Sequence, residues 1–248
     1  MRVGVISDVH GNLPALAAVL ADIRRESVDA VVSCGDVAAG PLPGPTLELL
    51  RDQELPIHYV CGNADRGMVD GFDQRAGAAH EDDRWAGSQI DAGQRDLLAA
   101  FLPALSLEVD GLGPVRFCHG TPRRDDEIVL QTSSADRFRR VLVGVTERTV
   151  VCGHTHMQFD RRVDHWRVVN VGSVGMPYGD PGAYWALLGP GVSLRRTKYD
   201  LPAAAEEIRR SSRWPKSGAF VEENLLRVPS AADALAHFQR LEAESADP

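Results

Sequence analysis

The sequence lacks any apolar run long enough to cross a bilayer, although hydrophobic residues make up 44% of its 248 positions. Its first segment reaches the acidic Asp8 too early to contain the apolar region of a secretory leader. We therefore expect a cytoplasmic protein with no membrane partner. The length and apolar content suffice for one large core, and we expect a single domain over residues 1–248.

An excess of basic residues is also absent. The formal net charge is -8 at pH 7 and the sequence pI is about 5.5. The chain therefore lacks the positive charge that general nucleic-acid binding requires, although a nucleotide-sized substrate is not excluded. The four cysteines are too widely spaced for CxxC metal knuckles and too few for a disulfide framework, so we expect them to be reduced.

The first sixty or so residues alternate between strands and helices. Three apolar, β-rich segments are typical of parallel strands covered on both faces: 2–7, 30–33 and 57–60. Between the first two, apolar residues recur at helical spacing from Leu13 to Ile23, and Asn12 is a suitable N-cap. A second helix is expected at about 45–52. This order predicts an α/β sheet with right-handed crossovers.

The rest of the chain divides into three parts. Residues 67–100 are rich in Gly, Asp and Arg, and we expect them to form an inserted helical cap. Residues 201–248 have a polar helical pattern with a break at Pro215, which predicts a C-terminal helical extension. Between these parts, β-rich segments and a helix at 134–142 predict a second sheet, with strands at 105–109, 115–118, 149–152, 167–171 and 184–188.

Five predicted strand ends share one feature, an Asp, Asn or His that follows the strand at once. They are Asp8-Val9-His10, Gly35-Asp36, Gly62-Asn63, Cys118-His119-Gly120 and Gly153-His154-Thr155-His156. Taken singly, each is an ordinary turn sequence. Ligands of open α/β sheets bind beyond the carboxyl ends of the strands, so five such ends in order indicate one site.

The donor types are those of a centre with two divalent cations. Two close cations need a bridging carboxylate, further oxygen or imidazole donors, and open positions for water. Asp36 is the natural bridge. Alternate residues of an extended segment point to one side, so Asp8 with His10, and His154 with His156, can each present two donors. The expected metal ligands are Asp8, His10, Asp36, Asn63, His119, His154 and His156.

These blocks resemble those of the calcineurin-like metallophosphoesterases, which are D-x-H, G-D, G-N-H-[DE], a single H, and G-H-x-H. The likeness runs from Asp8 to about residue 178 and is to the small prokaryotic, phosphodiesterase-type branch. It implies an α/β fold, a four-layer sandwich of two mixed β-sheets flanked by α-helices. It also implies two metal sites that share Asp36: one with Asp8, His10 and His156, the other with Asn63, His119 and His154.

The resemblance leaves the metal open among Mn, Fe, Zn, Co and Ni, and we favour manganese. A hydroxide bridging two such metals would attack phosphorus in line, without a covalent enzyme intermediate. Asp36 would hold both ions, while Asn63 would bind metal through its carbonyl and stabilise phosphoryl charge through its amide. For His10, metal ligation and orientation of the nucleophile both stay open. These three are the expected catalytic residues.

One position departs from the family pattern. Ala64 stands where many relatives have the histidine that is assigned as their general acid. Alanine cannot donate a proton, which predicts a loss of roughly 100-fold on poor leaving groups. We therefore expect phosphodiesters, or activated and nucleotide phosphates, to be better substrates than alkyl monoesters. Asp65 or Arg66 could compensate, although Asp65 could equally cap the turn that follows.

Arg66 and Arg123 are the candidates for binding the substrate phosphate, because each lies within five residues of a predicted ligand and guanidinium matches phosphate in geometry. Arg124 is a weaker candidate for the same role. The alternative interpretation of all three arginines is that they are solvated loop side chains. Other functions stay open: a protein phosphatase, a dinucleoside-polyphosphate phosphatase, and a non-catalytic interaction scaffold. An oligomer is also possible.

Overall fold

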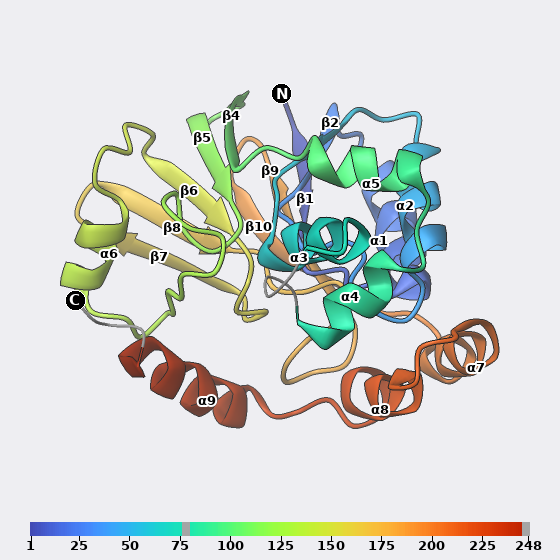
Figure 1. Cartoon of the computed structure of the whole chain (residues 1–248). Helices are drawn as coiled ribbons and strands as arrows, with labels where there is room; N and C mark the ends of the chain where they lie inside the picture. Colours follow the sequence, from blue (N-terminus) through green and yellow to red (C-terminus); the bar gives the residue numbers. More distant parts are fainter. Residues whose placement is uncertain (76–79, 245–248) are drawn as a thin grey trace.

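The computed structural model describes residues 1–75 and 80–244, and these form two five-stranded sheets (Figure 1). The first sheet has the order β10-β9-β1-β2-β3. Its strands are β1 (Val3–Ile6), β2 (Ala30–Ser33), β3 (Ile57–Tyr59), β9 (Ala183–Leu188) and β10 (Val192–Thr197). The sheet is mixed, because β1 pairs with β2 in parallel and with β9 in antiparallel orientation.

The second sheet has the order β4-β5-β6-β8-β7. Its strands are β4 (Ala104–Val109), β5 (Gly113–Cys118), β6 (Thr149–Cys152), β7 (Phe159–Val163) and β8 (Trp166–Asn170). This sheet is also mixed, since β6 pairs in parallel with β5 and β8 while the edge strands β4 and β7 run antiparallel to their neighbours.

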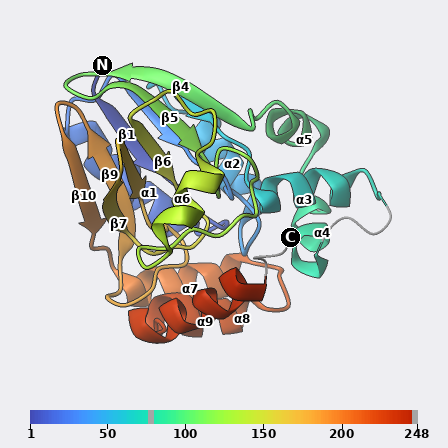
Figure 2. The same cartoon turned by 90° about the vertical axis from the view of Figure 1, so that its left-hand side faces the viewer.

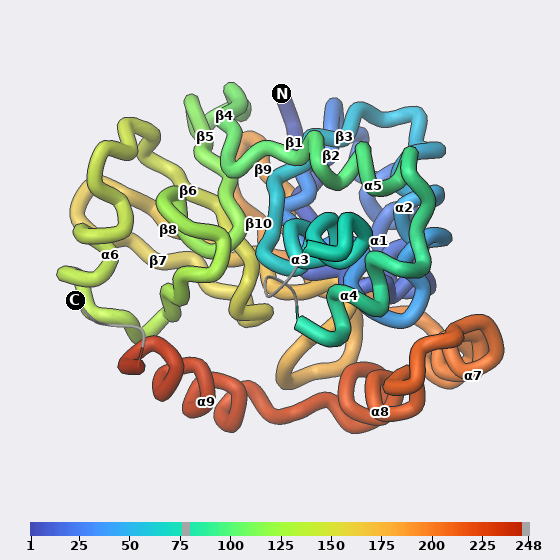
Figure 3. Tube along the Cα trace, viewed as in Figure 1, coloured from blue at the N-terminus to red at the C-terminus, as the bar shows by residue number. Residues whose placement is uncertain are grey.

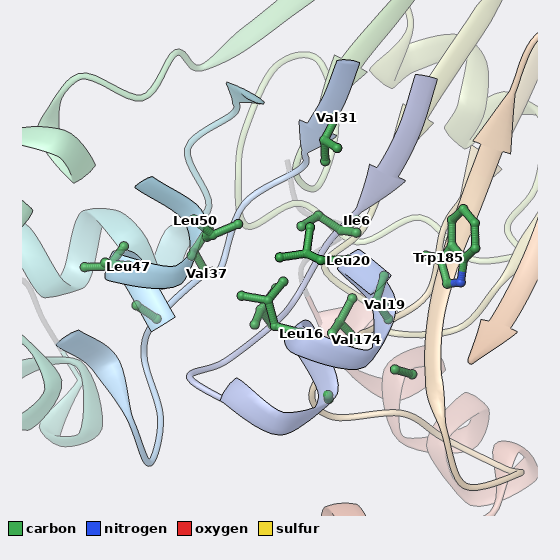
Figure 4. Packing of buried hydrophobic residues seen from close by; sticks show 14 of the residues in the cluster. Ile6, Leu16, Val19, Leu20, Val31, Val37, Leu47, Leu50, Val174 and Trp185 are labelled. Carbon is green, nitrogen blue, oxygen red and sulfur yellow. The ribbon is translucent and has the colours of Figure 1, made fainter. Parts of the chain in front are cut away.

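The two sheets face each other across a shared core, and Val5 of β1 lies in one buried cluster with Phe117 of β5. On the far side of the first sheet, α1 (Leu13–Arg25) and α2 (Pro43–Arg51) bury their apolar faces, as Figure 4 shows for Leu16. On the far side of the second sheet, Phe138 of α6, which spans Ala135–Val141, packs in the same way. The four-layer α/β sandwich predicted from the sequence is therefore confirmed.

Local sequence signals explain how the first unit forms. The residues of β1 and β2 are all buried, as expected of strands covered on both faces. The side-chain oxygen of Asn12 accepts a hydrogen bond from the backbone N–H of Ala15 at 3.3 Å, so Asn12 is the N-cap of α1 as predicted. This cap places the turn between β1 and α1, which carries Asp8 and His10, at the carboxyl end of the sheet.

Helices of the predicted cap are α3 (Asn63–Phe72), α4 (Glu81–Gly87) and α5 (Ala92–Ala99). The helical stretch begins at Asn63, before the predicted start at 67, because the Asp65 carboxylate accepts the N–H of Gly62 and caps the first turn. Residues 76–79 of this segment lie outside the described residues. That the segment is an inserted cap of one domain stays a prediction.

The C-terminal extension lies along one side of the molecule (Figures 1 and 2). It consists of α7 (Leu201–Ser211), α8 (Ser217–Val221), a short π-helix η1 (Glu222–Leu226) and α9 (Ala231–Glu244). The break predicted at Pro215 separates α7 from α8. Trp214 in this break stacks on Trp85 of α4, with ring centroids 5.8 Å apart. The trace in Figure 3 shows α9 running away from α8 towards the side of α6.

Two strands, β7 and β10, were not predicted from the sequence. Both are edge strands, and their exposed positions carry charged residues such as Arg162 and Arg195 that obscure the β pattern. Within the described ranges, every helix is too short or too polar to span a membrane.

Candidate metal centre

The strand ends that the sequence singled out converge at one edge of the two sheets. Two groups of side chains each have one donor atom per residue within 4.8 Å of the others in the described part of the chain: Asp8, His10 and His156, and Asp36, His119 and His154. Asn63 is the first residue of α3, a short turn after β3. The grouping of the carboxylates and histidines matches the division that the family resemblance implied.

The first group is compact. His156 Nε2 lies 3.2 Å from Asp8 Oδ1 and 3.2 Å from His10 Nε2. His10 Nε2 lies 3.9 Å from Asp8 Oδ1 and 3.8 Å from Asp36 Oδ2, so it stands between two carboxylates. An ion bound by Asp8 and His156 would therefore also be within reach of His10.

The second group shares these carboxylates. His119 Nε2 lies 3.2 Å from Asp36 Oδ2 and 3.9 Å from Asp8 Oδ1. The ring centroids of His119 and His154 are 5.1 Å apart. Asp36 Oδ2 thus lies within 3.8 Å of a histidine from each group.

Backbone carbonyls orient three of the imidazoles. His119 Nδ1 lies 2.6 Å from the carbonyl oxygen of Cys34, and His156 Nδ1 lies 2.8 Å from that of Met176. His10 Nδ1 lies 3.2 Å from the carbonyl oxygen of Ala39. An Nδ1–H that donates to a carbonyl leaves the Nε2 lone pair free and fixes the ring, which is the arrangement found around metal-ligating histidines.

The structure passes a direct test of whether cations fit. Asp8 Oδ1, Asn63 Oδ1 and His119 Nε2 are buried polar atoms without a hydrogen-bond partner among the described residues. Buried polar atoms are otherwise almost always paired. Carboxylate oxygen, amide oxygen and imidazole nitrogen are all donors to divalent cations. The three atoms therefore fit metal ligation, which would also account for the unpaired amide oxygen of Asn63.

The charges of the site point the same way. Burial disfavours the charged form of His119, but the carboxylates of Asp36 and Asp8 outweigh it and raise the pKa of His119 to about 10. Burial lowers the pKa of His154 to about 4, which keeps this imidazole neutral. Burial works against ionisation of Asp36, yet His119 and His10 hold its pKa below the usual range. The centre thus contains ionised carboxylates, and their buried negative charge favours the binding of a cation nearby.

Asp65 does not fill the place of the absent histidine. It is fully buried, and its two oxygens accept the backbone N–H groups of Gly62, Asp36 and Val37 at 2.8–2.9 Å. It therefore ties the start of α3 to the loop that carries Asp36. Ala64 contributes its N–H to Asp36 Oδ1 at 2.8 Å. Of the roles left open for Asp65, the contacts favour capping, and they extend it to the Asp36 loop.

The three arginine candidates line one cavity of about 500 Å³, together with Phe101 and Pro103. In sequence, these arginines lie close to Asn63 or His119. Arg66 donates two hydrogen bonds to Asp125, at 2.9 and 3.0 Å. Arg123 pairs with Glu127 and Arg124 with Asp126 in the same way. The structure thus brings Arg66 and Arg123 together, but each guanidinium already has a carboxylate partner.

Two residues far along the chain from the ligands that they contact were not predicted from the sequence. Ser173 Oγ donates to the backbone carbonyl of Asp8 at 2.7 Å and accepts from the N–H of Met176. The ring of Tyr178 stacks on His156, with centroids 5.8 Å apart. The likeness to the family includes Gly172-Ser173-Val174-Gly175, but nothing in this pattern shows which ligand the loop would contact.

Comparisons with known proteins agree with this geometry. The profile of the calcineurin-like phosphoesterase superfamily domain matches residues 1–189. A metallophosphoesterase from Sphaerobacter thermophilus has a TM-score of 0.69 and 26% sequence identity, covering 90% of this chain and 98% of that one. The hypothetical protein PH1004 from Pyrococcus horikoshii has a TM-score of 0.75 and 17% identity, covering 89% and 97%.

A curated relative matches a shorter stretch. The uncharacterized protein MJ0912 of Methanocaldococcus jannaschii is 41% identical over 68 residues, which is 27% of this chain and 27% of that protein. The family profile, in contrast, includes every residue of the two ligand groups and both sheets except β10. The chain therefore belongs to the calcineurin-like phosphoesterase superfamily and is a metal-dependent phosphoesterase.

Proposed function

We propose that the chain hydrolyses small phosphodiesters and activated or nucleotide phosphates with the help of two divalent cations, preferably manganese. The observation that supports this proposal is the sharing of Asp36 between two groups of ligands, since His10 and His119 both lie within 3.8 Å of its Oδ2. In this proposal Asp8, His10, Asp36 and His156 hold one ion, and Asp36, Asn63, His119 and His154 hold the other.

Two such cations supply an acidified water nucleophile and offset phosphoryl charge. The chain's own residues would orient the substrate. Asn63, bound to metal through its oxygen, is left with an amide that can donate to a phosphoryl oxygen. His10 keeps its Nε2 between the two carboxylates because its Nδ1 is held by Ala39. Arg66 and Arg123 would bind a substrate phosphate, which competes with their present carboxylate partners.

The proposed preference for diesters rests on the surroundings of Ala64. Its backbone N–H is committed to Asp36, and the oxygens of Asp65 already accept three backbone N–H groups. Arg66, the other compensating candidate, is too basic to act as an acid. A leaving group that needs no proton therefore suits the site best. The cavity lined by Phe101 is large enough for a nucleoside, which supports a nucleotide substrate.

A kinetic comparison tests the substrate preference. The manganese-loaded protein is assayed with bis-p-nitrophenyl phosphate and p-nitrophenyl phosphate, and we expect kcat/KM to be at least about 10-fold higher for the diester. Asp36→Asn, checked by circular dichroism, should lose roughly 100-fold or more on both. A clear preference of the wild type for the monoester would contradict the proposal.

The scaffold alternative is tested by metal content. A scaffold has no physical need for two buried carboxylates among four histidines, and this chain has kept all of them. We expect two manganese ions per chain after reconstitution and dialysis. Fewer than two, together with no hydrolysis of any ester, would favour the scaffold. Including a phosphopeptide and a dinucleoside polyphosphate in the same screen tests the two other phosphatase functions.

A further inference from the structure

Tyr178 lies beside the first ligand group on the loop between β8 and β9. Its ring stacks on that of His156, with centroids 5.8 Å apart and an interplanar angle of 26°. The same loop provides the Met176 carbonyl that fixes Nδ1 of His156 at 2.8 Å. Tyr178 therefore contacts His156 through its ring, and the loop that carries Tyr178 also holds the His156 imidazole through a backbone carbonyl.

The phenol group of Tyr178 is not used by the protein itself. The side chain is partly buried, and in the part of the chain that the structure describes its hydroxyl has no hydrogen-bond partner. By contrast, Tyr184 donates to the backbone carbonyl of Asp180 at 2.9 Å. A tyrosine phenol, whose ordinary pKa is about 10, is protonated at neutral pH and able to donate.

The C-terminal extension braces this side chain from outside. The ring of Phe238 on α9 meets Tyr178 edge to face, with centroids 6.1 Å apart and an angle of 72°. The N–H of Gly179 donates to the carbonyl of Pro229 at 2.8 Å. Glu242 of α9 pairs with the buried Arg137 at 3.0 Å, which anchors the helix on the second sheet's side. Residues beyond 189, outside the matched family profile, thus fix the position of Tyr178.

We propose that Tyr178 is a substrate-binding residue whose phenol donates a hydrogen bond to a phosphoryl oxygen of the ester held at the Asp8, His10 and His156 group. The inference rests on the proposed hydrolase function, because it places the phosphoryl group at the metal centre. An accessible donor without a protein partner beside a metal ligand can exchange water for a phosphoryl oxygen when an anionic substrate binds. The α9 helix acts through Tyr178, so Phe238 is a positioning residue.

The test separates the hydroxyl from the ring. Tyr178→Phe keeps the stacking on His156 and removes the donor, so we expect kcat/KM for bis-p-nitrophenyl phosphate to fall about 10- to 100-fold, as for loss of a hydrogen bond to a charged group. The affinity for manganese, measured by calorimetry, should stay at the wild-type value. Inorganic phosphate should bind the manganese-loaded variant at least about 5-fold more weakly. Tyr59→Phe, a change on β3, is the matched control and should match the wild type.

A second variant tests the brace. Phe238→Ala should lower kcat/KM by several-fold in the wild type but add little to Tyr178→Phe, because both act through one hydroxyl. Unchanged kinetics and phosphate binding in Tyr178→Phe would overturn the proposal, as would a loss fully explained by weaker manganese binding. If the wild type hydrolyses no ester, the proposed function fails, while phosphate calorimetry still reports on Tyr178.

Discussion

At the scale of single residues, the metal centre is built from strained backbone. Five of the ligands have positive φ angles without being glycine: Asp8, His10, Asp36, His154 and His156. Such conformations cost about 1–3 kcal/mol each and persist only where the surroundings impose them. Here the N–H of His10 donates to the carbonyl of Asp36 at 3.0 Å, and the N–H of His154 donates to Asp8 Oδ2 at 3.0 Å. The ligand loops hold one another in place.

This mutual support leaves no room for a side chain at Gly62. A Cβ at this position would overlap Asp36 Oδ1 and crowd the Asp36 backbone nitrogen. Gly62→Ala should therefore displace the shared carboxylate and lower kcat/KM roughly 100-fold or more, while the overall fold is kept. Steady-state kinetics and the number of bound manganese ions measure the effect.

Gly218→Ala is the control for this substitution. Nothing lies within 4 Å of a Cβ at Gly218 on α8, so activity and metal content should match the wild type. Gly62→Ala with normal metal content and normal activity would show that Asp36 does not need its present position.

At the scale of elements, α3 connects the metal centre with the predicted cap. Its first turn is tied to the Asp36 loop through Asp65, and its later turns pack against α4. Gly67 makes this packing possible, since the carboxylate of Asp83 from α4 fills the space where a Cβ would stand. The interface thus contains a buried carboxylate, and burial, followed by the charge of Asp36, raises the pKa of Asp83 to about 6.

This buried carboxylate should make stability depend on pH in the metal-free protein. The folded state binds the Asp83 proton more tightly than the unfolded state, whose pKa is about 3.9. The stabilisation that comes from this proton is therefore fully present at low pH. It is lost as pH rises from about 4 to about 6 and stays absent at higher pH. Asp83→Asn removes this loss, so we expect it to be more stable than the wild type by about 1–2 kcal/mol at pH 7.5 and nearly equal at pH 4.5.

Urea unfolding at the two pH values, in the presence of chelator, measures the difference. Asp82→Asn is the matched control, because Asp82 is a more exposed neighbour that pairs with Lys216 at 2.5 Å. It should lose up to about 1 kcal/mol at both pH values. Equal or lower stability of Asp83→Asn at pH 7.5 would contradict the role given to burial.

At the scale of the whole molecule, the sequence predicted what local patterns encode. The buried runs of β1 and β2 and the Asn12 cap specify the first β-α-β unit. The candidate metal ligands could be predicted because each lies at or soon after a strand end. The edge strand β10 was missed, since the adjacent exposed residues Arg195 and Arg196 interrupt the alternation expected of a strand. Some pairings depend on tertiary contacts alone, as at Leu102, which follows α5 and forms a bridge with Val60.

For the site, the sequence could identify donors but not their surroundings. Nothing local reveals that Arg66 is engaged by Asp125, or that Tyr178 reaches His156, because both contacts join distant parts of the chain. The carbonyls of Cys34 and Met176 are equally hidden, since every residue has one. Residue type predicts chemistry, whereas the partners that tune it depend on the completed fold.

The metal centre should also stabilise the whole molecule, because it neutralises the buried carboxylates of Asp8 and Asp36. Manganese at 100 times its dissociation constant contributes about 2.7 kcal/mol per site. Two sites together contribute about 5.4 kcal/mol, so for a chain of this size we expect Tm to rise by about 10–20 °C over the chelated protein. Asp36→Asn, which alters the shared ligand, should keep less than half of that shift, whereas Asp96→Asn on exposed α5 should keep all of it. Differential scanning calorimetry with and without manganese decides the matter, and an equal shift in Asp36→Asn would argue against a ligand shared by two ions.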